Sequence, residues 1–151
     1  MLDKAAPDFT LPATGGKLFQ LSAERGHPLL LYFYPKDSTP GCTTEAAQFR
    51  DLHEQFDKLG CRIYGISRDS MKSHENFKAK LALPFDLLSD SEEIACKLFA
   101  VIKLKKMYGK EVRGIERSTF LIDAVGILRR EWRALKADGH AAEVLSAVES
   151  L

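Results

Sequence analysis

The chain has 151 residues, of which 45% are hydrophobic and 28% charged, and this size and composition predict a single compact domain over residues 1–151. Lysine and arginine number 22 against 21 acidic residues, so the net charge gives no reason to expect binding to nucleic acid or to an anionic membrane surface. The first residues lack the apolar stretch of a secretory signal, and no apolar run reaches the length of a bilayer. We therefore expect a cytoplasmic protein that does not contact membranes.

In the first part of the chain, strand patterns precede a helix. Short apolar runs on either side of residues 15–16, both glycine, predict an N-terminal β-hairpin. The continuous apolar run at residues 28–34 predicts a central strand that is covered on both faces. Apolar residues at helical spacing then predict an amphipathic helix from about Thr43 to Gly60, namely Phe49, Leu52, Phe56 and Leu59.

The second part continues the alternation. The predicted elements are a strand at 61–67, a helix at about 73–81, a short strand near 85–88, a helix at about 92–99, a hairpin of 118–122 with 127–132, and a final helix at about 140–148. This order is that of an α/β domain. It predicts a thioredoxin-like fold with an N-terminal β-hairpin and inserted elements.

The most informative segment joins the apolar strand to the amphipathic helix and places Cys42 in the first helical turn. Free N–H groups and the positive end of the helix dipole stabilise a thiolate there. Gly41 lets the backbone approach a substrate closely, Pro35 stiffens the loop, and Thr39 can offer its hydroxyl to the thiolate and to a substrate oxygen. The residues alone leave a second interpretation open, in which Cys42 is only a small buried core residue after a helix cap.

Pro35, Thr39 and Cys42 form the pattern Pro-x-x-x-Thr-x-x-Cys, within the segment Tyr-Phe-Tyr-Pro-Lys-Asp-Ser-Thr-Pro-Gly-Cys-Thr at residues 32–43. This segment resembles the peroxiredoxins and, among them, the bacterioferritin comigratory protein or peroxiredoxin Q subfamily. The likeness continues at residues 6–12, 87–90 and 114–123. It implies a thiol peroxidase that reduces hydrogen peroxide and organic hydroperoxides through a cysteine thiolate and a sulfenic acid, with no metal and no cofactor.

The resemblance also implies roles for individual residues. Cys42 matches the peroxidatic cysteine, Thr39 and Pro35 its pocket partners, and Arg117 the catalytic arginine. A guanidinium stays charged and carries several N–H donors, so it can hold a thiolate and orient peroxide oxygens. Without the family, Arg117 at the entry to a strand would be interpreted as half of a surface ion pair.

The chain departs from the family pattern in its second cysteine. The position five residues after Cys42 is Ala47, and the following helix contains no cysteine. Cys61 begins a core strand and Cys96 lies among apolar helix positions, so we interpret both as packing residues. We therefore expect a one-cysteine cycle that is resolved by an external thiol, such as thioredoxin, glutaredoxin or a small thiol. An atypical two-cysteine cycle with Cys96 as the resolving cysteine, and a non-catalytic redox-sensing module, stay open as alternatives.

Other catalytic classes lack their residues. A disulfide oxidoreductase would need a second cysteine where Glu45 stands. The histidines stand in no hydrolase setting and are mostly expected to be solvated, and with the cysteines they show no zinc spacing; they are His27, His53, His74 and His140. We expect a monomer or a weak dimer.

Overall fold

The computed structural model describes residues 1–151 apart from the side chain of Met107. The strands of the described chain are β1 (Thr10–Ala13), β2 (Lys17–Gln20), β3 (Leu29–Phe33), β4 (Arg62–Ser67), β5 (Asp86–Ser89), β6 (Ile102–Met107), β7 (Lys110–Ile115), β8 (Ser118–Ile122) and β9 (Leu128–Arg133). The helices are α1 (Pro40–Lys58), α2 (Met71–Leu81), α3 (Ile94–Leu98) and α4 (His140–Glu149), with a 3-10 turn at Leu21–Glu24.

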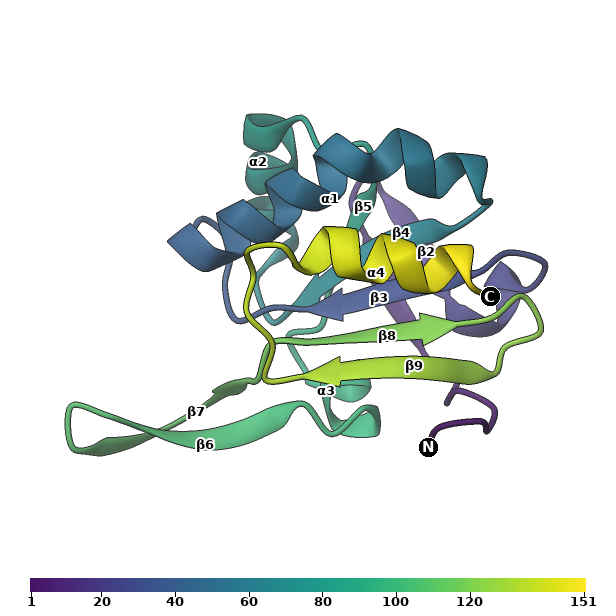
Figure 1. The fold of residues 1–151 in the computed structure, drawn as a ribbon. Coiled ribbons are helices and arrows are strands. Elements are labelled where there is room, and N and C mark those ends of the chain that lie inside the picture. The colour runs from purple at the N-terminus through teal and green to yellow at the C-terminus, as the bar shows by residue number, and fades with distance from the viewer.

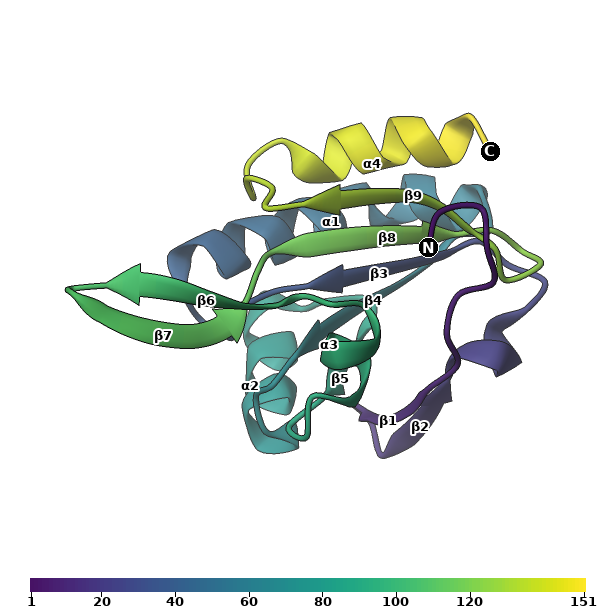
Figure 2. The same ribbon diagram turned by 90° about the horizontal axis from the view of Figure 1, so that it is seen from below.

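One sheet forms the centre of the molecule, with the strand order β2-β1-β5-β4-β3-β8-β9 (Figures 1 and 2). β3, β4 and β5 run parallel, whereas β1, β2, β8 and β9 pair with their neighbours antiparallel. The helices α1 and α4 lie side by side over one face of this sheet. The predicted N-terminal hairpin is β1–β2, and the predicted later hairpin is β8–β9.

β3 is the central strand that the apolar run predicts, and all its residues are buried. Successive side chains of a strand point to opposite faces of the sheet. Leu31 and Phe33 accordingly enter the core cluster that contains α3 and the N-terminal segment. Leu30 and Tyr32 enter the cluster beneath α1 and α4. The sheet thus separates two apolar cores, with Cys96 in the first and Cys42 and Cys61 in the second.

Three predicted helix starts differ from the structure. α2 begins at Met71 and not at about residue 73, because the side chain of Ser70 caps the helix there. α1 begins at Pro40 and not at about Thr43, because proline at the first helical position already has a helical φ and needs no N–H partner. α3 begins at Ile94 and not at about residue 92. Glu93 has φ 61°, in the left-handed region, which an α-helix cannot include.

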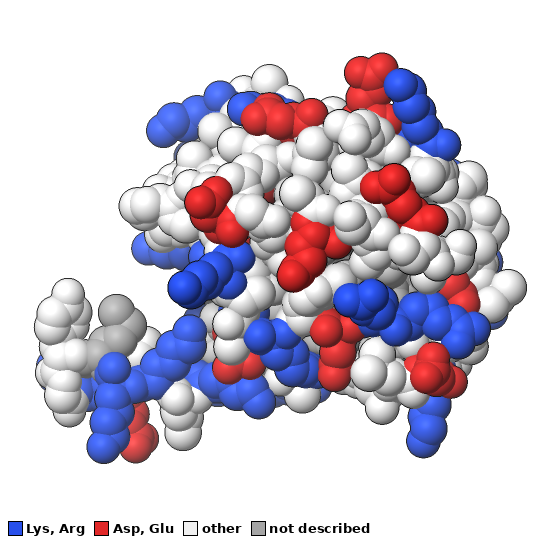
Figure 3. Space-filling model, in the orientation of Figure 1, with Lys and Arg blue, Asp and Glu red and all other residues white. Residues whose placement is uncertain are grey.

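An antiparallel arm formed by β6 and β7 was not predicted. Its strands pair from Ile102 with Ile115 to Met107 with Lys110, and Tyr108 and Gly109 both have positive φ, as a two-residue hairpin turn requires. The arm projects from the end of the body at which α1 begins (Figures 1 and 2). Figure 3 shows basic side chains gathered on it, and these include Lys103, Lys105, Lys106 and Lys110, all exposed. No helix in the described part of the chain is long and apolar enough to cross a bilayer.

Candidate active site

The loop at residues 34–39 connects the carboxyl end of β3 to the first turn of α1, and is called here the β3–α1 loop. Cys42 is the third residue of α1 and is only 1% exposed. The backbone N–H of Thr43 donates to the carbonyl of Thr39 at 2.9 Å, which closes the first helical turn around the cysteine. The sequence prediction of Cys42 at a helix N-terminus agrees with this geometry.

Arg117 lies between β7 and β8 and reaches the first turn of α1. Its Nη2 donates to the Sγ of Cys42 at 3.3 Å, and its Nη1 donates to Oε1 of Glu45 at 2.6 Å. The Arg117 side chain is 15% exposed, so water screens this contact weakly. The structure therefore brings the predicted arginine to the predicted cysteine across 75 residues of sequence.

Glu45 is a site residue that the sequence analysis did not identify. Its side chain is fully buried, and among the described residues its Oε2 has no hydrogen-bond partner. Burial raises the pKa of Glu45 to about 7, although the positive charge of Arg117 acts to lower it. The sequence feature that could have identified Glu45 is its position three residues after Cys42, because this spacing places both side chains on one face of the helix.

Gly41 makes room for the guanidinium. A Cβ at this position would lie 3.1 Å from Nη2 of Arg117, which is tighter than ordinary van der Waals contact. In the structure Arg117 approaches Gly41; the approach of a substrate to the Gly41 backbone stays a prediction. Pro35 is exposed in the β3–α1 loop.

Thr39 is half-buried and precedes α1. Its hydroxyl donates to the backbone carbonyl of Lys36 at 2.8 Å and not to Cys42 as the sequence analysis expected. A hydroxyl has one hydrogen and two lone pairs, so this bond commits the hydrogen and leaves the oxygen available as an acceptor.

The three cysteines are free thiols in separate places. Cys61 follows α1 and lies in the core beneath it, and Cys96 lies in the core on the opposite face of the sheet from Cys42. Burial raises the pKa of Cys61 to about 12 and the pKa of Cys96 well above the usual range for a thiol. Both thiols therefore stay protonated, and unreactive, in the folded protein.

The expectation that most histidines are solvated is wrong for His74 and His140, which are buried. Each has polar partners that offset its burial. His140 Nε2 lies 2.8 Å from the hydroxyl of Thr119, and the two ring nitrogens of His74 contact Asp37 and the carbonyl of Leu88. Sequence periodicity carries no information about such partners.

Comparison of the sequence with known proteins gives extensive matches. Residues 2–131 match the family model described as the AhpC/TSA family. Peroxiredoxin Bcp of Xanthomonas campestris is 52% identical over 149 residues, which cover 99% of this chain and 93% of the relative. Peroxiredoxin Bcp of Bacillus subtilis is 50% identical over 150 residues, which cover 99% of this chain and 96% of the relative.

Solved structures show the same likeness. The bacterioferritin comigratory protein of Xanthomonas campestris, whose structures concern its alkyl peroxide reduction activity, superposes with a TM-score of 0.90 at 52% identity, covering 94% of this chain and 90% of that one. A peroxiredoxin 6 of Arenicola marina has a TM-score of 0.84 at 19% identity, covering 99% of this chain and 72% of that one. The second likeness concerns the fold alone. Together they confirm the predicted thioredoxin-like α/β fold.

Proposed function

We propose that Cys42 is the cysteine that attacks the peroxide, since the chain belongs to the AhpC/TSA family and to its peroxiredoxin Bcp and Q branch. Members of this branch are thiol-dependent peroxidases, and so is this protein. The observation that carries this assignment is the Nη2 of Arg117 at 3.3 Å from the Cys42 Sγ, at the N-terminus of α1. The guanidinium and the helix N-terminus both place positive charge beside the sulfur and stabilise the thiolate. A thiolate is the nucleophilic form of cysteine.

The reaction transfers one oxygen atom to sulfur. The Cys42 thiolate attacks the terminal oxygen of hydrogen peroxide or an organic hydroperoxide in line with the O–O bond, so a sulfur–oxygen bond forms as the O–O bond breaks. Cys42 becomes a sulfenic acid, and the hydroxide or alkoxide that leaves takes up a proton from solvent, equivalent to the one that the Cys42 thiol released when it ionised. Arg117 stabilises the charge that develops on the leaving oxygen. Thr39 accepts a hydrogen bond from the O–H of the substrate, because its own hydrogen is committed to Lys36.

The cycle that we propose uses one cysteine and an external thiol. The helix between Cys42 and Lys58 rises about 24 Å along its axis, and Cys61 lies beyond that far end. Cys96 is on the other face of the sheet. A disulfide requires Cα atoms within about 7 Å, so either pairing would require part of the fold to open first.

Two external thiols return the Cys42 sulfenic acid to the thiol in two steps. A thiol of thioredoxin, glutaredoxin or a small molecule attacks the sulfenic sulfur, releases water and forms a mixed disulfide. A second thiol then releases Cys42 as a thiol and leaves the reductant as a disulfide. We also propose that the protein works as a monomer or a weak dimer. Three free thiols are consistent with the reducing cytoplasm as its location.

The test compares three matched serine variants. Cys42→Ser should lose peroxidase turnover, whereas Cys61→Ser and Cys96→Ser should retain it with a small thiol as the reductant. After one equivalent of peroxide without reductant, dimedone should label Cys42 and mass spectrometry should show little intramolecular disulfide. A dominant Cys42–Cys96 disulfide would contradict the one-cysteine cycle, and turnover by Cys42→Ser would contradict the assignment of Cys42 itself.

A further inference from the structure

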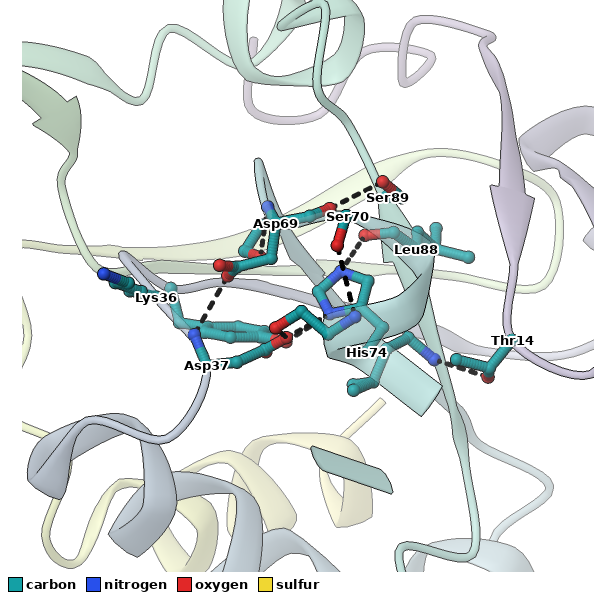
Figure 4. A network of polar contacts seen from close by, with 12 residues as sticks. Thr14, Lys36, Asp37, Asp69, Ser70, His74, Leu88 and Ser89 are labelled. Atoms are coloured by element: carbon teal, nitrogen blue, oxygen red, sulfur yellow. Dashed lines mark hydrogen bonds and ion pairs between the residues drawn. The ribbon is translucent and has the colours of Figure 1, made fainter. Parts of the chain in front are cut away.

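A buried network of hydrogen bonds joins the β3–α1 loop to the end of β4 and the start of α2 (Figure 4). The peroxidase chemistry described above makes no direct use of these side chains. They come from residues 34–37 and from residues 67–74, and are Tyr34, Asp37, Ser67, Asp69, Ser73 and His74.

Asp69 receives two hydrogen bonds on one carboxylate oxygen. The backbone N–H of Asp37 donates to its Oδ2 at 2.9 Å, and the hydroxyl of Ser67 donates to the same atom at 2.6 Å. The backbone of Asp69 is held as well, because its N–H donates to the Ser67 hydroxyl at 3.1 Å and its carbonyl accepts from the hydroxyl of Ser89 at 2.6 Å. Asp69 is thus fixed to β4 and β5 and presents its carboxylate to the β3–α1 loop.

The Asp37 N–H that Asp69 holds shares a peptide unit with the Lys36 carbonyl, and this carbonyl accepts the hydrogen of the Thr39 hydroxyl at 2.8 Å. A peptide unit is planar, so fixing the direction of its N–H also fixes the direction of its C=O. Asp69 therefore determines where the Thr39 hydroxyl hydrogen points. It also determines where the acceptor lone pairs of that oxygen point.

The side chain of Asp37 holds the same loop from another direction. Its carboxylate accepts from the hydroxyl of Tyr34 at 2.6 Å, from the hydroxyl of Ser73 at 2.8 Å and from Nδ1 of His74 at 2.7 Å. The other ring nitrogen of His74 lies 2.9 Å from the Leu88 carbonyl, so the ring is held between the β3–α1 loop and β5. Burial acts to raise the pKa of Asp37, but the hydrogen bonds from His74 and Tyr34 outweigh it and lower the pKa.

The nearby oxygen and nitrogen atoms of Asp37, Asp69 and His74 lie within 4.8 Å of one another, a spacing that also suits a cation. Hydrogen bonds within the network already engage these atoms, at 2.6 to 2.9 Å. The geometry therefore favours a clamp on the loop over a metal site.

We propose that Asp69 is a positioning residue for peroxide reduction. Through the Lys36–Asp37 peptide it holds the Thr39 hydroxyl as the acceptor for the O–H of the substrate. This inference rests on the role proposed above for Thr39, and it adds that the orientation of that hydroxyl is imposed by a carboxylate that does not touch the substrate.

The test is a double-mutant cycle on the rate of Cys42 oxidation, measured by stopped-flow with hydrogen peroxide and no reductant. Thr39→Val and Asp69→Ala should each slow oxidation by about tenfold, the equivalent of one well-placed hydrogen bond. When Asp69→Ala is added to Thr39→Val, the rate of Cys42 oxidation should fall by less than about a further twofold, because the effects of two residues that act through one hydroxyl are not additive. Asp69→Asn keeps an acceptor oxygen and should fall between wild type and Asp69→Ala.

The matched control is Ser70→Ala, since Ser70 is the next residue along and its hydroxyl caps α2 at Ser73 without touching the Lys36–Asp37 peptide. It should lower thermal stability and leave the oxidation rate unchanged. If Thr39→Val slows oxidation but Asp69→Ala does not, or if the two losses simply add, the positioning role is overturned while the proposed function stands. If Thr39→Val itself oxidises at the wild-type rate, the proposed role of Thr39 fails and the inference fails with it. Should Asp69→Ala not fold, Asp69→Asn alone and with Thr39→Val makes the same comparison.

Discussion

Cys42 and Glu45 lie one helical turn apart on α1, and both contact the guanidinium of Arg117. The arginine divides its donors between a sulfur atom and a carboxyl group. Glu45 is fully buried, so its charged form depends on this one partner. The ionisation of Glu45 should therefore change the free energy of unfolding of the whole protein.

The stability of the protein should fall as the pH rises through the titration of Glu45. Its folded pKa of about 7 lies above the ordinary value of 4.5, so the folded state binds this proton more tightly than the unfolded state. The contribution to stability is complete below pH 4.5 and is lost as the pH rises through about 7, at a cost of at most about 3 kcal/mol. Glu45→Gln removes the titration. The free energy of unfolding in urea should therefore fall less between pH 5 and pH 8 in the variant than in wild type.

The control for this experiment is Glu54→Gln, because Glu54 is on the same helix with its side chain 85% exposed. Its pH profile should follow that of wild type. If the profile of Glu45→Gln also runs parallel to wild type, the carboxyl group of Glu45 keeps an ordinary pKa and this interpretation is wrong.

At the scale of elements, the β6–β7 arm is attached to the body by ion pairs at its base. Glu93 Oε2 accepts from Nη1 of Arg68 at 3.0 Å and also from Nη1 of Arg113 on β7. A further donor of Arg68 lies 3.4 Å from the Arg113 carbonyl. Because little apolar surface of the outer arm is buried, these contacts at its base should govern how often the arm opens.

Glu93→Gln should make the arm more susceptible to trypsin, since the amide removes the charge that pairs both arginines. We expect cleavage at the arm lysines to become several-fold faster, with the thermal midpoint of the body nearly unchanged. Glu111→Gln removes a negative charge from the arm without changing its base, so it is the matched control and should be cleaved at the wild-type rate. Equal cleavage of both variants would show that Glu93 does not hold the arm.

At the scale of the whole molecule, the central sheet and the length of α1 keep the thiols apart. Cys96 packs on one face of the sheet, Cys42 on the other, and Cys61 beyond the far end of α1. The thiols of Cys61 and Cys96 should consequently become accessible only when the core opens.

In Cys42→Ser protein, iodoacetamide should modify Cys61 and Cys96 slowly under native conditions. The rate should rise with urea in step with the loss of helical circular dichroism, because burial keeps both thiols protonated and covered. Rapid modification of Cys96 in the absence of urea, with Cys61 still protected, would show a local opening near α3. Such an opening would reinstate the two-cysteine alternative.

The sequence by itself determined the features that follow from local pattern. The apolar run of β3, the helical spacing of α1 and the position of Cys42 between them all depend on neighbouring residues, and the motif around Cys42 identified the family. Boundaries shifted where one residue had a special conformation, as at Pro40 and Glu93. The arm was missed because Tyr-Gly is a weak turn signal between two strands that are rich in charged residues.

Only the tertiary structure decided which distant residues meet. Arg117 reaches Cys42 and Glu45 across more than 70 residues, and Asp69 reaches Asp37 across 32. Whether a carboxyl group or an imidazole is buried depends on partners that the packed sheet brings to it, because burial without a partner is too costly. Spacing along the chain carries no record of those partners, so the hydrogen bond from the Thr39 hydroxyl to the Lys36 carbonyl and the separation of the cysteines emerged only from the folded chain.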